Sequence, residues 1–301
     1  MANRPFAAGR SSNPDHRKPD RTRPMSATDR PLIDEAKKLD PDRTLAVALA
    51  EPADRPIMAA LVLLNAELAR IPEVVSEPMA GMIRYQWWRD AVARAARGEG
   101  HTLHPLLPPL AAALAAGRLR PPALAALIDA REAELERLQP DDLEALESYV
   151  AATSGALHAL MAEALGGDAA VIEAARRGGN AYALVGILRA IGFHQAQDRL
   201  LLPADLVERE GIDRNDILAA RNEEALARVF AAILERARRH LAAAAAAGPF
   251  ARRVLPSLLP ARLTARQIRR LETKGPRAAA AATRDAWTVP DLLWCWLIRR
   301  I

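Results

Sequence analysis

The sequence predicts an all-α protein built as a single helical bundle. Half of its 301 residues are hydrophobic but only 4% are aromatic. Much of the chain is alanine, leucine and arginine, which all favour helices. No regular alternation of apolar and polar residues indicates a sheet, and no repeat of fixed period is present. The length is sufficient to bury one large core.

The first 40 residues differ from the rest of the chain. Basic residues there are set among prolines and serines with almost no apolar pattern. We therefore expect residues 1–40 to form a basic, disordered tail and residues 41–301 to form the helical domain. The tail lacks the apolar stretch of a secretion signal, and its acidic residues Asp15 and Asp20 argue against a transit peptide.

Prolines and capping residues divide the domain into helices. Pro56 fits the first turn of a helix capped by Asp54 and running to about Val75, with Pro72 as a kink or an end. Pro78 opens the next helix.

Further along, Gly117 and Pro121 separate two alanine-rich helices. Another helix begins after Pro140 and ends at Gly166. One apolar face of it is expected to pack in the bundle core. That face consists of Leu143, Leu146, Val150, Leu157 and Leu160.

A last well-marked helix is expected from Asp168 to about Gln195. Small or weakly polar residues occur along it at spacings of three and four, which place them on one helix face. These residues are Ala183, Gly186, Ala190 and His194.

The end of this segment carries the most specific motif of the chain. Residues 188–194 read Leu-Arg-Ala-Ile-Gly-Phe-His, and Arg199 and the run Leu-Leu-Pro at 201–203 follow. The pattern resembles the squalene/phytoene synthase family, which has Leu-Arg-Asp-x-x-x-Asp followed by Arg-x-Tyr-Leu-Pro. The family's two aspartates hold Mg²⁺ against a prenyl diphosphate, and here their positions are Ala190 and His194. Alanine offers no ligand and imidazole suits other metals better than Mg²⁺, so the resemblance implies that this magnesium site is lost.

The resemblance extends over residues 60–203. Residues 61–73 are similar to the family's first aspartate-rich helix, with Ala69 and Glu73 at its two acidic positions. Residues 82–92 contain the tryptophan and arginine of the helix that follows this motif in the family. Of the two acidic positions of the first motif, only the second therefore keeps an acid, Glu73.

Two further segments match the family in part. Residues 127–135 resemble its Leu-Ile-x-Gly-Met-x-x-Asp-Leu, and residues 150–155 resemble its Val-Ala-Gly-x-Val-Gly. Where the family has Gln-Leu-x-Asn, this chain has Ala183 and Gly186 in place of the two polar residues. The resemblance thus implies an isoprenoid-synthase-like bundle around a central cavity that has lost its polar lining.

The pattern is most similar to a branch of the family that assists the assembly of respiratory complex I. It implies a non-catalytic protein without a cofactor, whose partners belong to a membrane respiratory complex. One alternative is a prenyl-diphosphate-condensing transferase of phytoene/squalene synthase type, which uses Mg²⁺ and acids such as Glu67, Glu73, Asp129 or Glu134. Another is an isoprenoid- or lipid-binding module whose cavity is lined by Ala183 and Gly186.

Arginines provide candidate phosphate- or ligand-binding residues, because a guanidinium group pairs with two oxygens at once. The alternative is that they pair with nearby acids and only fix helix packing. We expect His194 to be a structural histidine, since no serine or cysteine nucleophile motif accompanies it. The candidates are Arg70, Arg189, Arg199 and Glu134.

The C-terminal segment 287–301 is rich in tryptophan and too short to span a bilayer, which takes about 20 apolar residues. It suits an interfacial membrane anchor, or else its rings pack against the bundle. The membrane-contact candidates are Trp294, Trp296, Arg299 and Arg300.

The formal net charge of +5 favours an acidic partner or an anionic surface. Nucleic acid is not expected, because no recognition motif accompanies the charge. The single cysteine, Cys295, excludes an internal disulfide and fits a reducing compartment. We therefore expect a cytoplasmic protein at the periphery of the inner membrane.

Overall fold

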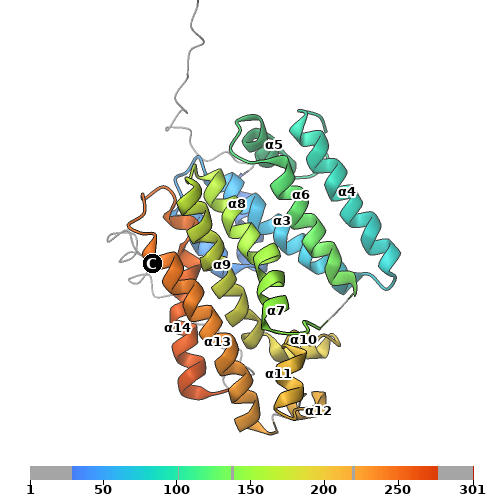
Figure 1. Ribbon diagram of the computed structural model, residues 1–301. Helices are drawn as coiled ribbons and strands as arrows, with labels where there is room; N and C mark the ends of the chain where they lie inside the picture. The colour runs from blue at the N-terminus through green and yellow to red at the C-terminus, as the bar shows by residue number, and fades with distance from the viewer. Residues whose placement is uncertain (1–28, 101, 137–138, 219–220, 277–300) are drawn as a thin grey trace, which may run out of the picture.

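The computed structural model describes residues 29–100, 102–136, 139–218, 221–276 and 301. Every regular element in these ranges is helical, which confirms the all-α class (Figure 1). The elements are α1 (Asp29–Leu39), α2 (Pro41–Leu49), α3 (Arg55–Val74), α4 (Pro78–Ala96), α5 (Leu107–Ala115), α6 (Pro121–Glu132), the 3₁₀ turn η1 (Ala133–Glu136), α7 (Leu143–Val150), the π turn η2 (Ala151–Gly155), α8 (Ala156–Ala164), α9 (Ala169–Arg189), α10 (Ile191–Ala196), α11 (Ala204–Arg209), α12 (Arg214–Leu218), α13 (Glu223–Ala246), the 3₁₀ turn η3 (Leu255–Ser257) and α14 (Leu259–Lys274).

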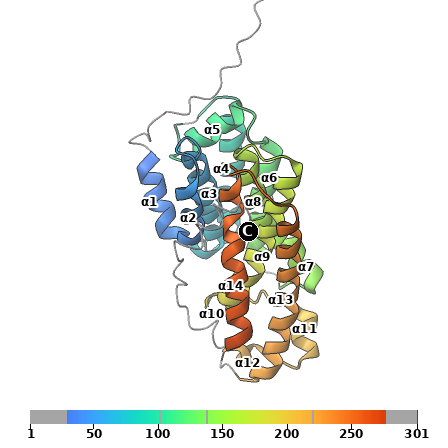
Figure 2. The same ribbon diagram turned by 90° about the vertical axis from the view of Figure 1, so that its left-hand side faces the viewer.

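The helices enclose two large hydrophobic clusters, and α9 contributes to both. Ala174 and Ala175, in its first half, belong to the cluster that α1, α3, α4, α5, α6 and α8 surround. Leu184 and Leu188, in its second half, belong to the cluster between α7, α9, α11 and α13. Figure 2 shows α13 and α14 running along the same side of the bundle, beside α9. Helix α9 is therefore the central helix of the fold and connects the two clusters.

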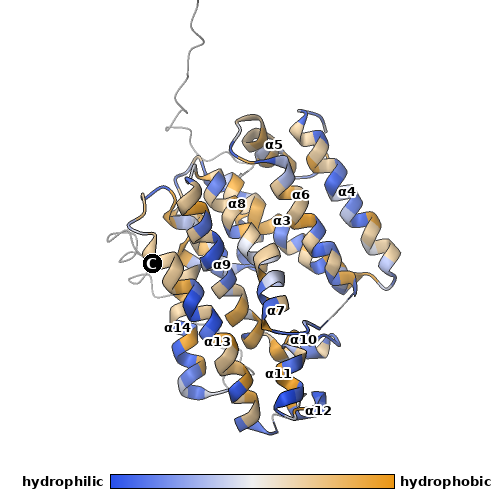
Figure 3. Cartoon of the chain, in the orientation of Figure 1, coloured by the Kyte–Doolittle hydropathy of each residue, from blue (hydrophilic) through white to orange (hydrophobic). Residues whose placement is uncertain are grey.

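The long helices carry hydrophilic as well as hydrophobic residues (Figure 3). Within the described ranges, no helix has both the length and the apolar composition needed to cross a bilayer.

Several helix boundaries follow the local pattern of the sequence. Helix α3 spans nearly the expected range and carries Pro72 inside its last turn. Helices α4 and α6 begin at Pro78 and Pro121, because a proline at the first helical position has no N–H to leave unpaired. The side chain of Asp142 accepts a hydrogen bond from the Ala145 N–H at 2.8 Å and caps α7.

Part of the segment expected to be a disordered tail is helical. Helix α1 lies within the range assigned to the tail, and it packs against α3. Leu32 and Ala36, spaced one turn apart, are buried in the first cluster. A boundary at residue 40 is therefore wrong, because this short amphipathic helix gains its stability from tertiary burial. Residues 1–28 lie outside the described part of the chain.

The helix expected over residues 168–195 is two helices. Helix α9 ends at Arg189, and Ala190 has a φ of −94° and a ψ of 12°, after which α10 begins at Ile191. Ala183 and Gly186 therefore lie on one helix and His194 on the next. The four small or weakly polar residues do not form one continuous helical face, although each of them is half-buried.

The apolar face expected over residues 143–160 is also divided. Leu146 and Val150 pack in the second cluster, whereas Leu157 and Leu160 pack in the first. The π turn η2 between them adds a residue to one turn, so the faces of α7 and α8 point in different directions.

Two glycines let the π turn approach α9 closely. A Cβ atom added to Gly179 of α9 would lie 2.7 Å from the Ser154 carbonyl oxygen and 3.0 Å from the Gly155 Cα atom. Side chains at this crossing would force the two segments apart. Gly155 is the last residue of the segment that resembles the family's Val-Ala-Gly-x-Val-Gly.

A buried arginine fastens α2 to the same crossing. Arg43 pairs with Asp40 at 2.6 Å and donates hydrogen bonds to Ser154 Oγ at 2.8 Å and to His158 Nε2 at 3.1 Å. Burial, together with the Arg43 guanidinium, lowers the pKa of His158 to about 3. The imidazole is therefore neutral, and its Nδ1–H donates to the Ser257 carbonyl oxygen at 3.1 Å.

The Gly179→Ala substitution should destabilise the protein by about 1–3 kcal/mol, because the added methyl group overpacks the crossing. Gly186→Ala, on the same helix, is the matched control: a Cβ atom there would meet nothing within 4 Å. It should stabilise the helix by about 0.5–1 kcal/mol. Urea unfolding followed by circular dichroism measures both changes. Equal effects of the two substitutions would contradict the close crossing.

Candidate functional site

A buried polar network lies where α6, η1 and α3 meet. Arg131, at the end of α6, is 9% exposed, forms an ion pair with Glu134 and donates a hydrogen bond to Asn65 Oδ1 at 2.7 Å. Asn65 lies on α3, so the arginine links the first part of the bundle to the middle of the chain.

Glu134 is the centre of this network. Its carboxylate accepts a hydrogen bond from the Tyr149 hydroxyl of α7 at 3.0 Å. Its other oxygen lies 3.7 Å from Arg199 Nη2, in the segment after α10. Glu134 and Arg199 are 5% and 7% exposed. Two guanidinium groups therefore face one carboxylate, and the network has an excess of positive charge.

Electrostatics settle the protonation of two neighbouring groups. Burial lowers the pKa of His194 to about 4, with a further lowering by Arg199 and an opposing effect of Glu134. Burial also raises the pKa of Tyr149 to about 12, and the Glu134 carboxylate adds to this shift. At neutral pH the imidazole is therefore uncharged and the phenol keeps the proton that it donates to Glu134.

A pocket of about 340 Å³ opens beside this network. Arg199 lines it, and the Nε atoms of Arg199 and Arg131 have no hydrogen-bond partner among the residues that the structure describes. The lining residues are Ala130, Ala133, Glu134, Glu136, Gln139, Pro140, Asp141, Ala145, Tyr149, Arg199 and Leu201.

The structure brings together three of the residues singled out in the sequence, namely Glu134, Arg199 and His194. Glu73, the surviving acid of the first motif, is exposed near the end of α3, and Ala69 is half-buried. Of the cavity candidates, Ala183 packs against the second hydrophobic cluster, while Gly186 has open space beside it. The C-terminal candidates Trp294, Trp296, Arg299 and Arg300 lie outside the described residues.

Arginine pairing with acids occurs, and some of the pairs join different helices. Arg89 of α4 pairs with Asp129 at 2.7 Å and with Glu132, both on α6. Arg189 lies 3.8 Å from Asp42 of α2. These pairs join helices that are distant in the sequence, whereas the expected acids were sequence neighbours.

Sequence reasoning missed three members of the network, namely Asn65, Arg131 and Tyr149. Asn65 and Arg131 lie inside segments that resemble family motifs, and Tyr149 directly precedes another. A buried polar residue inside an apolar helix segment was the available indication, because such a group requires a partner.

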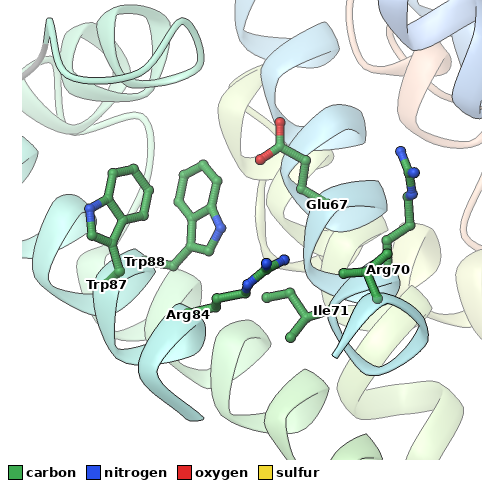
Figure 4. Close-up of a pocket in the computed structure, with 7 residues that line it drawn as sticks. Glu67, Arg70, Ile71, Arg84, Trp87 and Trp88 are labelled. Atoms are coloured by element: carbon green, nitrogen blue, oxygen red, sulfur yellow. The ribbon is translucent and has the colours of Figure 1, made fainter. Parts of the chain in front are cut away.

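A second pocket, of about 410 Å³, lies between α3 and α4 on the surface (Figure 4). Arg70, another candidate from the sequence, lines this pocket and not the buried network. The lining residues are Glu67, Arg70, Ile71, Val74, Arg84, Trp87 and Trp88.

Glu67 is the carboxylate of this surface pocket. Burial raises its pKa to about 7, against an opposing effect of Arg70. Glu67 Oε2 lies 3.7 Å from His104 Nε2, and the histidine ring packs edge-on against Trp88 with ring centroids 5.0 Å apart. Burial lowers the pKa of His104. The pocket is therefore partly desolvated.

Residues 36–289 match the model of the squalene/phytoene synthase family. The chain belongs to the squalene/phytoene synthase family. Its fold is similar to those of two solved enzymes. The squalene synthase HpnC from Alicyclobacillus acidocaldarius has a TM-score of 0.63 and 20% identity, over 84% of this chain and 93% of that one. A dehydrosqualene synthase in complex with ligand has a TM-score of 0.70 and 13% identity, over 83% and 87%.

Curated relatives within the family have a different description. The chain is 30% identical over 217 residues to NADH dehydrogenase (ubiquinone) complex I, assembly factor 6, of Bos taurus, covering 72% of this chain and 65% of that protein. It is 31% identical over 184 residues to the Mus musculus protein of the same description, covering 61% and 55%. The chain thus spans less than two thirds of the length of these relatives.

The residues at the squalene/phytoene synthase motif positions do not fit a magnesium-bound diphosphate. Ala190 has no ligand atom, and the His194 imidazole is a poor magnesium ligand. The nearby acid, Glu134, lies between Arg131 and Arg199, whose positive charges oppose a bound cation. Within the described ranges, no three His, Cys, Asp or Glu side chains form a metal-binding group.

Glu134→Gln should destabilise the protein by about 3–5 kcal/mol, because it leaves two buried guanidinium groups without a counter-charge. Asp129→Asn is the matched control. It removes a carboxylate that is 60% exposed and should cost about 0–1 kcal/mol. Urea unfolding measures the difference. A loss of less than about 1 kcal/mol for Glu134→Gln would contradict the central role of this residue.

Glu67 should make stability depend on pH. Its folded pKa of about 7 lies above the ordinary value of 4.5, so the folded protein retains a proton that the unfolded chain releases. The stabilisation of the folded state by this retained proton is complete below pH 4.5 and is lost as the pH rises to 7. The melting temperature of Glu67→Gln should therefore fall less between pH 4.5 and pH 7 than that of the wild type. Glu73→Gln, at an exposed carboxylate, is the control, and identical profiles for wild type and Glu67→Gln would refute the prediction.

Proposed function

We propose that this protein is a non-catalytic member of the squalene/phytoene synthase family that acts in the assembly or maturation of respiratory complex I. The curated relatives support this, since they are described as complex I assembly factors and match most of the chain. The observation that carries the proposal is the replacement of the second aspartate pair by Ala190 and His194.

The buried network supports a structural role for the former catalytic region. Family enzymes need carboxylates that hold magnesium, whereas Glu134 here is paired with Arg131 and Arg199. Such a network links helices α6 and α7 to the segment after α10 and stabilises one arrangement of the bundle. Rigid scaffolding is what a protein that binds other proteins requires.

The partners of this protein, on the proposed function, are subunits or intermediates of a membrane respiratory complex. It acts without a cofactor, from the periphery of the inner membrane. The cationic and aromatic composition of residues 287–301 suits contact with an anionic bilayer.

Deletion of the gene in its host tests the proposal. It should lower NADH:ubiquinone oxidoreductase activity and the amount of assembled complex I several-fold, and the wild-type gene should restore both. Squalene, hopanoid and carotenoid levels should stay unchanged. The purified protein, given Mg²⁺ with farnesyl or geranylgeranyl diphosphate, should release no pyrophosphate above the protein-free background.

The opposite pattern would overturn the proposal. Pyrophosphate release, together with unchanged complex I in the deletion strain, would establish a prenyl-diphosphate-condensing transferase. A stoichiometric isoprenoid or lipid co-purifying with the protein, again with unchanged complex I, would instead establish a lipid-binding module. Mass spectrometry of the purified protein detects such a ligand.

A further inference from the structure

Helix α4 lies at the edge of the bundle (Figure 1) and exposes an apolar stripe. Met79, Met82, Ile83 and Trp87 are 64%, 46%, 64% and 37% exposed. Met79, Ile83 and Trp87 are spaced by four residues and Met82 lies three residues after Met79, so the four side chains share one broad face. The opposite face of α4 is buried through Tyr85 and other residues. A contiguous exposed stripe of this kind is typical of an interaction surface.

The stripe borders the pocket between α3 and α4. Trp87 belongs to both, and Arg70 and Arg84 lie at the pocket in Figure 4. Both arginines are exposed, and Arg70 lies close enough to Glu67 to oppose the rise in its pKa. The combined surface therefore offers a concave site with apolar residues, one carboxylate, Glu67, and two exposed cations that can pair with acidic groups of a partner.

The charge of this surface argues against two possible occupants. Exposed acids, Glu73, Glu77 and Asp90, lie next to the stripe, so an anionic bilayer spread over the whole surface would meet them and would also be too flat to fill the pocket. A helix can place its acidic residues only beside the pocket, where Arg70 and Arg84 lie. The two ends of this chain are also excluded, because their net positive charge would be repelled by Arg70 and Arg84. Residues 1–28 contain six basic and two acidic residues, and residues 277–301 contain four basic and two acidic residues.

We propose that the stripe Met79, Met82, Ile83 and Trp87, with the adjoining α3–α4 pocket, is the docking site for an amphipathic helix of a partner protein. An apolar anchor of that helix fills the pocket, and its acidic residues pair with Arg70 and Arg84. Helix-in-groove recognition uses this combination of spaced apolar anchors and flanking charges. The identity of the partner as a component of the assembling complex rests on the proposed function.

Two dye-labelled helical peptides test the docking site on the full-length protein. Both carry a leucine and phenylalanine stripe, flanked by glutamates in one and by lysines in the other. Fluorescence anisotropy should show the glutamate peptide binding at least about tenfold more tightly, because only it pairs with the arginines. Arg70→Glu/Arg84→Glu should reverse this preference.

Further variants separate the apolar contribution from the charge contribution. Ile83→Asp should weaken both peptides about tenfold or more, because it places a charge in the centre of the stripe. Phe193→Asp and Arg209→Glu are matched controls at exposed positions of α10 and α11 and should leave binding unchanged. Circular dichroism verifies that each variant is folded.

Three outcomes would overturn the docking site. They are equal affinities for the two peptides, binding that does not change in Ile83→Asp, and preferential binding to phosphatidylethanolamine/phosphatidylglycerol vesicles that Ile83→Asp abolishes. The peptide assay tests the docking surface, whereas the gene deletion tests the biological role. Normal peptide binding with unaffected complex I would refute the proposed function alone. Lost peptide preference with impaired complex I would refute the docking site alone.

Discussion

Backbone contact between the π turn η2 and helix α9 positions the central helix, against which α8, α13 and α14 pack. Gly155 and Gly179 have no side chains to separate the two segments, so α9 runs through the middle of the bundle and joins both hydrophobic clusters. Arg43 reinforces the crossing from α2 through hydrogen bonds to Ser154 and through its guanidinium, which stacks 4.5 Å from the centroid of the Tyr182 ring. A buried, fully engaged cation of this kind tolerates little displacement of its neighbours.

The same crossing orients the buried network. Because η2 offsets α7 from α8, Tyr149 at the end of α7 faces Glu134 across the bundle. Thr153 ties the π turn back to Tyr149 with a hydrogen bond of 2.8 Å to its carbonyl oxygen. The frame of the squalene/phytoene synthase family is thus retained while its interior chemistry differs. Guanidinium groups balance a carboxylate here, whereas in the family's enzymes carboxylates balance magnesium.

The change of interior chemistry and the exposed surface of α4 support one interpretation. The ion-paired interior stabilises the bundle, and its carboxylate Glu134 is engaged by Arg131 and Arg199. The outer face of α4, in contrast, combines apolar side chains with the arginines Arg70 and Arg84 beside a pocket. The replacement of the family's aspartates by Ala190 and His194 and the proposed docking surface on α4 together support the proposed role in binding other proteins.

The sequence by itself determined the helical class, the helix starts at Pro78, at Pro121 and soon after Pro140, and the absence of acids at Ala190 and His194. These depend on a residue's own chemistry and on neighbours within one or two turns. Only the tertiary structure decided the burial of α1, the break at Ala190 and the network around Glu134. The reason is physical: Arg131 and Asn65 are 66 residues apart in the chain, and their pairing arises only when the packed helices bring them together.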